Sequence, residues 1–334
     1  MKKVVSGIRP TGKLHLGNYF GAVKNFIRMQ NEFESYFFIA DYHSLTTHPT
    51  PGDLHQSVHR VFAEYLAMGL DPDKCTLYIQ SDLPQTAELY MFFNMNAYLG
   101  ELQRLTSFKD KIRSQPDNVN AGLLTYPTLM AADILLHKGE LVPVGKDQEQ
   151  HLEMTRTFGN RFNRLYNVEY FPEPVAFNYN DELVKVPGLT GGGKMSKSAG
   201  EMDNIYMSDA EDVIRKKIMK AVTTTVEGAS EPGSEKPQAI QNLFDLMNLV
   251  CEKDVIAHFE STYYDGTIRF GDMKKQLAED MVKFVAPISL KIQDAMNNPE
   301  LVANAAKQGT EKASESANKT ISEVREIIGF KKFY

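Results

Sequence analysis

The chain has 334 residues, of which 42% are hydrophobic and 24% charged, enough to bury a full-size core in about two domains. Its formal net charge of -6 argues against a protein that coats nucleic acid, although a local basic patch is compatible with it. Cys75 and Cys251 form no CxxC pattern, which argues against a metal site and favours free thiols in a reducing compartment. The first apolar run is too short for a signal peptide or membrane span, so we expect a cytoplasmic protein.

Three short apolar runs predict strands at residues 4–5, 36–40 and 76–79. A helical pattern follows the first run at about residues 18–29, and Thr50 with Asp53 forms a capping box that opens a helix after the second. Alternating strands and helices predict an α/β fold of the Rossmann type, with a parallel sheet covered on both faces. Ligands in such folds bind at the carboxyl ends of the strands, so we looked for a site at residues 7–18, 41–44 and 142–151.

Helical spacing dominates the rest of the chain. From about residue 85 to 137 it predicts a helical insertion, after which strand character returns at residues 142–144. A loop rich in Gly, Lys and Ser covers residues 185–203, and from about residue 208 to 334 the spacing is helical with one break, at residues 297–299. We therefore predict a Rossmann catalytic domain over residues 1–204, with an insertion at about 85–137, and an all-α C-terminal domain over residues 205–334.

Two segments have the composition of phosphate-binding loops. Residues 10–18 read PTGKLHLGN between a strand and a helix, although a simple strand–helix turn explains this segment equally well. Residues 194–198 read KMSKS behind three glycines, and two lysines on such a loop can clamp a triphosphate unless the loop is merely solvated. A P-loop reading of residues 188–194 fails because Met195 stands where Ser or Thr is required.

A third segment, LLTYPTLMAADILLH at residues 123–137, places Tyr126, Met130 and Asp133 on one helical face. A carboxylate in such apolar surroundings needs a hydrogen-bond donor. The donor is either a nearby Lys, Arg or backbone N–H, or the indole N–H of a substrate. The residues alone favour a donor from the protein itself, a nearby Lys, Arg or backbone N–H.

Taken together, these segments resemble the class I aminoacyl-tRNA synthetases. His15-Leu16-Gly17-Asn18 is similar to the His-Ile-Gly-His signature of that class, with Asn18 at a position where the tyrosine and tryptophan members vary, and residues 194–198 match the second signature. The helix around Asp133 resembles the tryptophan members, residues 145–151 match a stretch shared with the tyrosine members, and residues 41–43 match a further pocket segment. The resemblance covers roughly residues 3–225.

This resemblance implies activation of L-tryptophan with ATP to tryptophanyl-adenylate and pyrophosphate, followed by transfer to the 3′ end of tRNA(Trp). It implies catalytic roles for His15, Lys194 and Lys197, with Mg²⁺ carried by ATP and no protein metal site. The predicted ATP-binding residues are Arg9, Pro10, Thr11, His15, Gly17, Asn18, Gly145, Lys146, Asp147, Val186 (beside adenine), Lys194, Met195, Ser196, Lys197 and Ser198. The predicted tryptophan-binding residues are Val5, Gly7, His43, Tyr126, Met130, Asp133, Val142, Val144 and Gln148, with Asp133 accepting from the indole and Gln148 and Tyr126 holding the α-amino group.

The resemblance also implies a homodimer formed through the helical insertion and an anticodon-binding role for the C-terminal helices. An apolar run in the insertion belongs either to the core or to the dimer interface: Tyr90, Met91, Phe92, Phe93, Met95 and Tyr98. Two basic groups are predicted to contact tRNA unless they are only solvated faces: Arg215, Lys216, Lys217 and Lys220 at the anticodon, and Arg104, Lys109, Lys111 and Arg113 at the acceptor stem. The alternatives are a tyrosine enzyme with a Gln-rich pocket helix, a paralogue that charges no tRNA, and a nucleotide-binding regulator without turnover.

Overall fold

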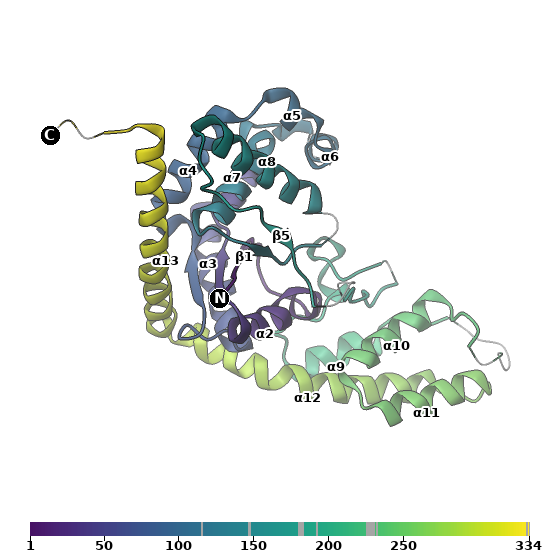
Figure 1. Cartoon of the computed structure of the whole chain (residues 1–334). Coiled ribbons are helices and arrows are strands. Elements are labelled where there is room, and N and C mark those ends of the chain that lie inside the picture. Colours follow the sequence, from purple (N-terminus) through teal and green to yellow (C-terminus); the bar gives the residue numbers. More distant parts are fainter. Residues whose placement is uncertain are drawn as a thin grey trace. The chain divides into compact units, whose positions relative to one another are not determined.

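The computed structural model describes residues 1–114, 116–145, 148–179, 184–191, 193–224, 231, 233–331 and 333 (Figure 1). Its contacts divide the chain into two compact units. The first consists of Met1–Gly12, Asn25–Leu183 and Asn298–Tyr334, and the second of Lys13–Lys24 and Val184–Asn297. The sequence predicts one boundary near residue 205, whereas both units contain segments that are distant in the chain. The assignment of an anticodon-binding domain to residues 205–334 stays a prediction.

The first unit is built on a five-stranded sheet with the strand order β3-β2-β1-β4-β5. All the pairings are parallel, with Val5 of β1 beside Tyr36 of β2 and Phe37 of β2 beside Leu77 of β3. This confirms the predicted Rossmann-type α/β fold. The strands are β1 (Lys3–Ile8), β2 (Glu34–Ile39), β3 (Thr76–Ile79), β4 (Leu141–Val142) and β5 (Val175–Ala176).

Helix α3 (Pro51–Met68) follows β2 and shows how local sequence sets the ends of a helix. Thr50 Oγ1 accepts a hydrogen bond from the Asp53 backbone N–H at 3.2 Å, as the capping box predicts. Gly69 ends the helix with a φ of 114°, a left-handed conformation that glycine adopts without strain. The length and position of α3 therefore follow from its own residues.

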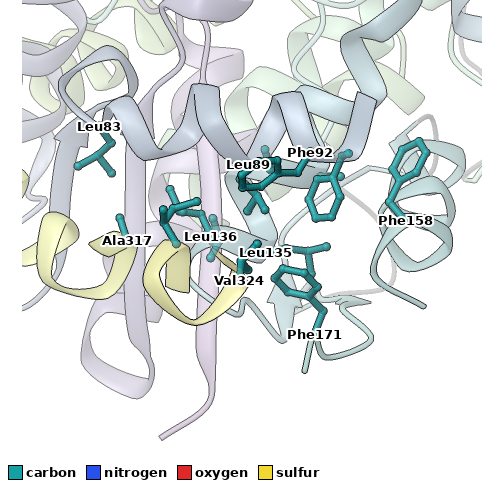
Figure 2. Packing of buried hydrophobic residues seen from close by; sticks show 14 of the residues in the cluster. Leu83, Leu89, Phe92, Leu135, Leu136, Phe158, Phe171, Ala317 and Val324 are labelled. Atoms are coloured by element: carbon teal, nitrogen blue, oxygen red, sulfur yellow. The ribbon is translucent and has the colours of Figure 1, made fainter. Parts of the chain in front are cut away.

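The predicted helical insertion is confirmed, and its helices pack into the core of the first unit. Figure 2 shows Leu89 and Phe92 of α4, Leu135 and Leu136 of α7, and Phe158 of α8 in one hydrophobic cluster. Buried apolar surface of this kind is the main source of folding free energy. The insertion contains α4 (Pro84–Asn96), α5 (Leu99–Arg104), α6 (Thr106–Ser114) and α7 (Ala121–Leu136), whereas α8 (Glu149–Tyr166) follows β4.

Helix α13 (Pro299–Ile328) also belongs to this core, although it follows the sheet far along the chain. Its Ala317 and Val324 lie in the cluster of Figure 2. Gly309 brings the helix backbone directly against β3, because a Cβ at this position would collide with the carbonyl oxygen of Leu77. The small residue lets α13 cover β3, which is an edge strand of the sheet.

The second unit is mainly helical, and α9 and α10 pack against α12. The turn α1 (Leu16–Asn18) and the π-helix η1 (Tyr19–Val23) belong to this unit, and the chain continues as α2 (Lys24–Glu32), which lies in the first unit from Asn25 onward. Tyr19 and Phe20 contact Phe284 of α12, with ring centroids 5.3 and 5.4 Å apart. The other helices are α9 (Glu211–Met219), α10 (Gln238–Val250), α11 (Lys253–Tyr264) and α12 (Phe270–Asn297).

The break predicted at residues 297–299 is confirmed, since Asn298 caps α13 by accepting from the Leu301 backbone N–H. The prediction of a single break is wrong, because α9, α10, α11 and α12 are also separated from one another. Gly233 and Pro237 lie in one of these separations, where they interrupt helical hydrogen bonding. None of the described helices is both long enough and apolar enough to cross a membrane.

Candidate active site

The two signature segments lie together within the second unit. Residues 14–16 pair with residues 205–207 through Leu16 N–H to Ile205 O at 2.8 Å and Met207 N–H to Leu14 O at 2.9 Å. A Cβ at Gly17 would lie 2.9 Å from the His15 ring and 3.7 Å from the Met195 Cβ. The absence of a Cβ at Gly17 therefore leaves space for the His15 ring, while Gly17 and Met195 lie within ordinary contact distance of each other.

His15 is buried, with 6% of its surface exposed. Burial, together with the charge of Lys197, lowers the pKa of His15 to about 4. The imidazole is therefore neutral at pH 7 and can offer one ring N–H to a phosphate oxygen. The Asn18 side chain accepts a hydrogen bond from the His15 backbone N–H at 3.0 Å, so it holds the turn on which His15 sits.

The lysine-bearing loop begins as a narrow hairpin. Met195 N–H donates to Val186 O and Gly188 N–H donates to Gly193 O, both at 2.8 Å. Val186 is buried at 2% exposure, whereas Lys194 is exposed. The loop therefore presents Lys194 to solvent from an ordered base, and the role of Val186 beside adenine stays a prediction.

Two residues behind this loop escaped the sequence analysis. Asn204 Nδ2 donates to the carbonyl oxygens of Ser196 and Gly200, both at 2.8 Å. Asp203 Oδ1 accepts from the backbone N–H of Thr190 at 2.8 Å and from its hydroxyl at 2.6 Å. Both side chains are at most 1% exposed, so they anchor the loop from inside. Two adjacent polar residues at the end of a glycine-rich loop were the signal available in the sequence.

The residues predicted to bind tryptophan all lie in the first unit, and one of them, Asp133 of α7, is buried with 3% of its surface exposed. His43 Nε2 lies 2.8 Å from its Oδ2, and Gln80 Nε2 donates to its Oδ1 at 2.6 Å. His43 belongs to the 3-10 helix η2 (Tyr42–Thr47) after β2, and Gln80 opens η3 (Gln80–Asp82) after β3. The donors are thus side chains of other elements rather than the Lys, Arg or backbone N–H that the sequence favours.

The carboxylate of Asp133 is held in a state that can accept a further hydrogen bond. Burial raises its pKa, while the hydrogen bonds from His43 and Gln80 act in the opposite direction. A carboxylate has about four acceptor positions, and each oxygen here uses one with these partners. By this count the carboxylate keeps acceptor capacity for a donor-only group such as an indole N–H.

Aromatic rings extend from the His43 partner of this carboxylate. The ring centroids of Tyr126 and His43 are 4.5 Å apart, and those of Tyr126 and His151 are 5.6 Å apart. Gln148 Oε1 lies 2.8 Å from His151 Nδ1, which links Gln148 to the same group. Four of the predicted residues, His43, Tyr126, Asp133 and Gln148, are thereby connected.

The predicted apolar residues fall into two groups. Met130 and Val144 pack on a cluster that contains Val142, whereas Val5 belongs to the larger core of the first unit. Gly7 is needed for packing, because a Cβ there would collide with the ring of Phe38. These residues contribute apolar packing rather than hydrogen bonds.

The remaining predicted ATP residues divide between the units. Arg9, Pro10, Thr11 and Gly145 are in the first unit, and Lys146 and Asp147 lie outside the described residues. The charge of Arg9 acts on the Tyr126 hydroxyl and opposes the rise of its pKa.

The basic group predicted at the anticodon is only partly available. Arg215 forms ion pairs with Glu211 and Glu279, and Lys217 is buried against Asp209 at 2.8 Å. The prediction of an exposed cluster is therefore wrong for Lys217, whereas Lys216 and Lys220 are exposed. All four members of the second basic group, Arg104, Lys109, Lys111 and Arg113, are exposed.

Known proteins share this fold and these segments. The family described as tRNA synthetases class I (W and Y) matches residues 1–286. The tryptophan–tRNA ligase of Porphyromonas gingivalis is 54% identical over 331 residues, covering 99% of this chain and 100% of that protein. That of Rickettsia conorii is 39% identical, covering 98% and 99%. The crystal structure of tryptophanyl-tRNA synthetase from Campylobacter jejuni, complexed with ADP and tryptophan, is 31% identical, with a TM-score of 0.86 over 98% of this chain and 100% of that one. With this match across both signature segments, the chain belongs to the class I tRNA synthetases of the tryptophan and tyrosine group.

Proposed function

We propose that this chain, a tryptophan–tRNA ligase, joins L-tryptophan to ATP to form tryptophanyl-adenylate and then charges the 3′ end of tRNA(Trp). The observation that carries the substrate assignment is the buried Asp133 carboxylate, which is held by His43 and Gln80. The apolar wall is assigned to Met130, Val142 and Val144, which cluster in the same unit. The two free cysteines suit the reducing conditions of the cytoplasm, where we place the reaction.

Asp133 distinguishes tryptophan from other aromatic amino acids. The indole N–H donates to the carboxylate while the ring is buried against the apolar wall. Phenylalanine would leave the acceptor without this donor, at a cost of roughly 2–5 kcal/mol. Tyr126 and Gln148 hold the α-amino group, and the tryptophan carboxylate is left to react.

The chemical step needs no protein nucleophile. A carboxylate oxygen of tryptophan attacks the α-phosphorus of ATP in line, and the bond from that phosphorus to the pyrophosphate oxygen breaks. Neutral His15 donates to a phosphate oxygen, and Lys194 and Lys197 stabilise the charge on the departing pyrophosphate. Mg²⁺ carried by ATP would supply further neutralisation of the phosphate charge. The tRNA ribose hydroxyl then attacks the adenylate carbonyl and releases AMP.

The same proposal includes a homodimer. Of the apolar run in α4 and the residues that follow, Phe92 and Phe93 are core residues, whereas Met91, Met95 and Tyr98 are 45%, 79% and 64% exposed. Such exposed apolar side chains on adjoining turns are typical of an interface. Burial assigns Phe92 and Phe93 to the core, and we propose the exposed residues of the run for the dimer interface.

The test is ATP–pyrophosphate exchange with each of the twenty amino acids separately, with Mg²⁺ and without tRNA. We expect exchange with tryptophan alone, and a strong rise of the KM for tryptophan in Asp133→Ala. Exchange with tyrosine would overturn the role of Asp133. No exchange with any amino acid would overturn the activation step as written.

A further inference from the structure

Gln80 is a buried amide at the carboxyl end of β3, with 1% of its surface exposed. Its Oε1 accepts the backbone N–H of Tyr42 at 3.0 Å, and its Nε2 donates to Asp133 Oδ1 at 2.6 Å. The backbone partner can only donate and an ionised Asp133 can only accept, so the network defines the orientation of the amide.

The amide also braces the segment that carries the second donor to Asp133. Asp41 Oδ1 accepts from the backbone N–H groups of Tyr42 at 3.1 Å and Ser81 at 3.0 Å, which joins the ends of β2 and β3. His43, the residue after Tyr42, donates to the other carboxylate oxygen of Asp133. Gln80 therefore touches Asp133 directly and also holds the turn that presents His43.

We propose that Gln80 is a positioning residue that determines specificity for the indole N–H. It fixes the plane of the Asp133 carboxylate, so that one acceptor position faces the substrate. This inference rests on the proposed role of Asp133. It adds a residue that does not itself contact tryptophan and whose loss should affect substrates with an N–H more than those without one.

The ionisation of Asp133 depends on the same contact. The groups that act on this carboxyl are His43 from η2 and Gln80 from η3. Two tyrosines also face it, Tyr78 from β3 and Tyr126 from its own helix, and the charge of Asp133 raises the pKa of each of their hydroxyls. Burial raises the pKa of Asp133, and the hydrogen bonds from His43 and Gln80 lower it. Without the amide the pKa rises further, so the carboxyl becomes a weaker, protonated acceptor at a higher pH.

The experiment measures kcat and KM in pyrophosphate exchange for tryptophan and for β-(3-benzothienyl)alanine, in which sulfur replaces the indole N–H. Gln80→Met keeps the length of the side chain but removes both polar contacts. We expect its preference for tryptophan over the analogue, as a ratio of kcat/KM, to fall by about ten-fold, mainly through the KM for tryptophan. The increase of the KM for tryptophan on acidification should also begin at a higher pH than in the wild-type protein.

Gln80→Glu supplies the conservative variant. Its new carboxyl can donate to Asp133 only when protonated, so the KM for tryptophan should improve as the pH is lowered, opposite to Gln80→Met. The matched control is Gln30→Met, since Gln30 is also buried and bridges Gly69 O and the Asp71 N–H elsewhere in the first unit. It should leave the preference ratio unchanged.

If the wild-type protein prefers tryptophan strongly and Gln80→Met keeps the same ratio of kcat/KM for tryptophan over the analogue, the role of Gln80 is overturned. The role of Asp133 is then unaffected. A wild-type protein that does not prefer tryptophan over the analogue would instead refute the proposed role of Asp133. Equal losses in Gln30→Met and Gln80→Met would reduce Gln80 to a structural residue.

Discussion

At the scale of single residues, the first unit contains a buried histidine, His137, which the proposed reaction does not use. Its Nε2 lies 2.9 Å from the Tyr78 hydroxyl, and its ring stacks on Tyr36 with centroids 4.3 Å apart. Burial, helped by the charge of Lys3, lowers the pKa of His137 to about 3. The histidine therefore stays neutral in the folded protein throughout the physiological range.

This makes folding stability depend on pH in a predictable direction. The unfolded chain binds a proton at His137 below about pH 6.5 while the folded chain does not, so stability is complete above that pH and is lost as the pH falls toward 3. By pH 5 the loss is about 2 kcal/mol. His137→Gln should reduce the difference in unfolding free energy between pH 7 and pH 5 by this amount in urea titrations. His258→Gln, at an exposed position, is the control, and an equal reduction there would refute the explanation.

Site residues that belong to a recognisable sequence motif were predictable. Residues whose role depends on hydrogen-bond partners distant in the sequence were not. His15, Lys194 and Lys197 belong to short motifs, and Asp133 is marked by its apolar neighbours. Gln80 carries no such mark, because its importance depends on Tyr42 and Asp133, which are distant in sequence. Its place directly after a predicted strand was the available clue, and the sequence analysis did not extend to that position.

At the scale of elements, the strands with buried apolar runs were predicted, whereas β5 was not. In β5, Val175 and Ala176 are both exposed, so the segment has no burial pattern, and only its pairing with β4 makes it a strand. The position of α13 was also not predictable, because helical spacing shows which face is apolar without showing what that face packs against. Gly309 is the local feature on which this packing depends.

We expect Gly309→Ala to destabilise the first unit by about 1–3 kcal/mol or more, because a Cβ must displace either α13 or the backbone of β3 at Leu77. Helix propensity alone would favour alanine by about 1 kcal/mol, so a loss of stability isolates the collision. Gly100→Ala in α5 is the matched control, since its Cβ would meet nothing within 4 Å. Thermal unfolding distinguishes the two, and a stabilised Gly309→Ala would contradict the close packing.

At the scale of the whole molecule, the proposed homodimer depends on the exposed apolar side chains that follow the buried part of α4. Met95→Asp places a charge in this surface and should give a monomer in light scattering at micromolar concentration. Leu290→Asp changes a similarly exposed residue of α12 and should leave the dimer intact. A wild-type monomer would remove the interface from the proposal.

Binding of tRNA should weaken steeply as salt increases if the exposed basic residues contact phosphates. Lys109→Ala and Lys216→Ala should each reduce the slope of log affinity against log salt by about one. Arg215→Ala is the matched contrast on α9, since its guanidinium is already engaged by Glu211 and Glu279, and its slope should not change. Flat salt dependence in the wild-type protein would count against both basic groups.

The return of α13 to the sheet has a consequence for synthesis on the ribosome. The strands of the first unit emerge early, but the helix that covers the edge of β3 emerges only after the whole second unit has been translated. During that interval the nascent sheet exposes a strand edge open to pairing with neighbouring chains, which is where chaperones act. Polypeptides that end between residues 184 and 297 contain all five strands of the sheet but lack α13. Such truncated products should therefore aggregate and be degraded quickly.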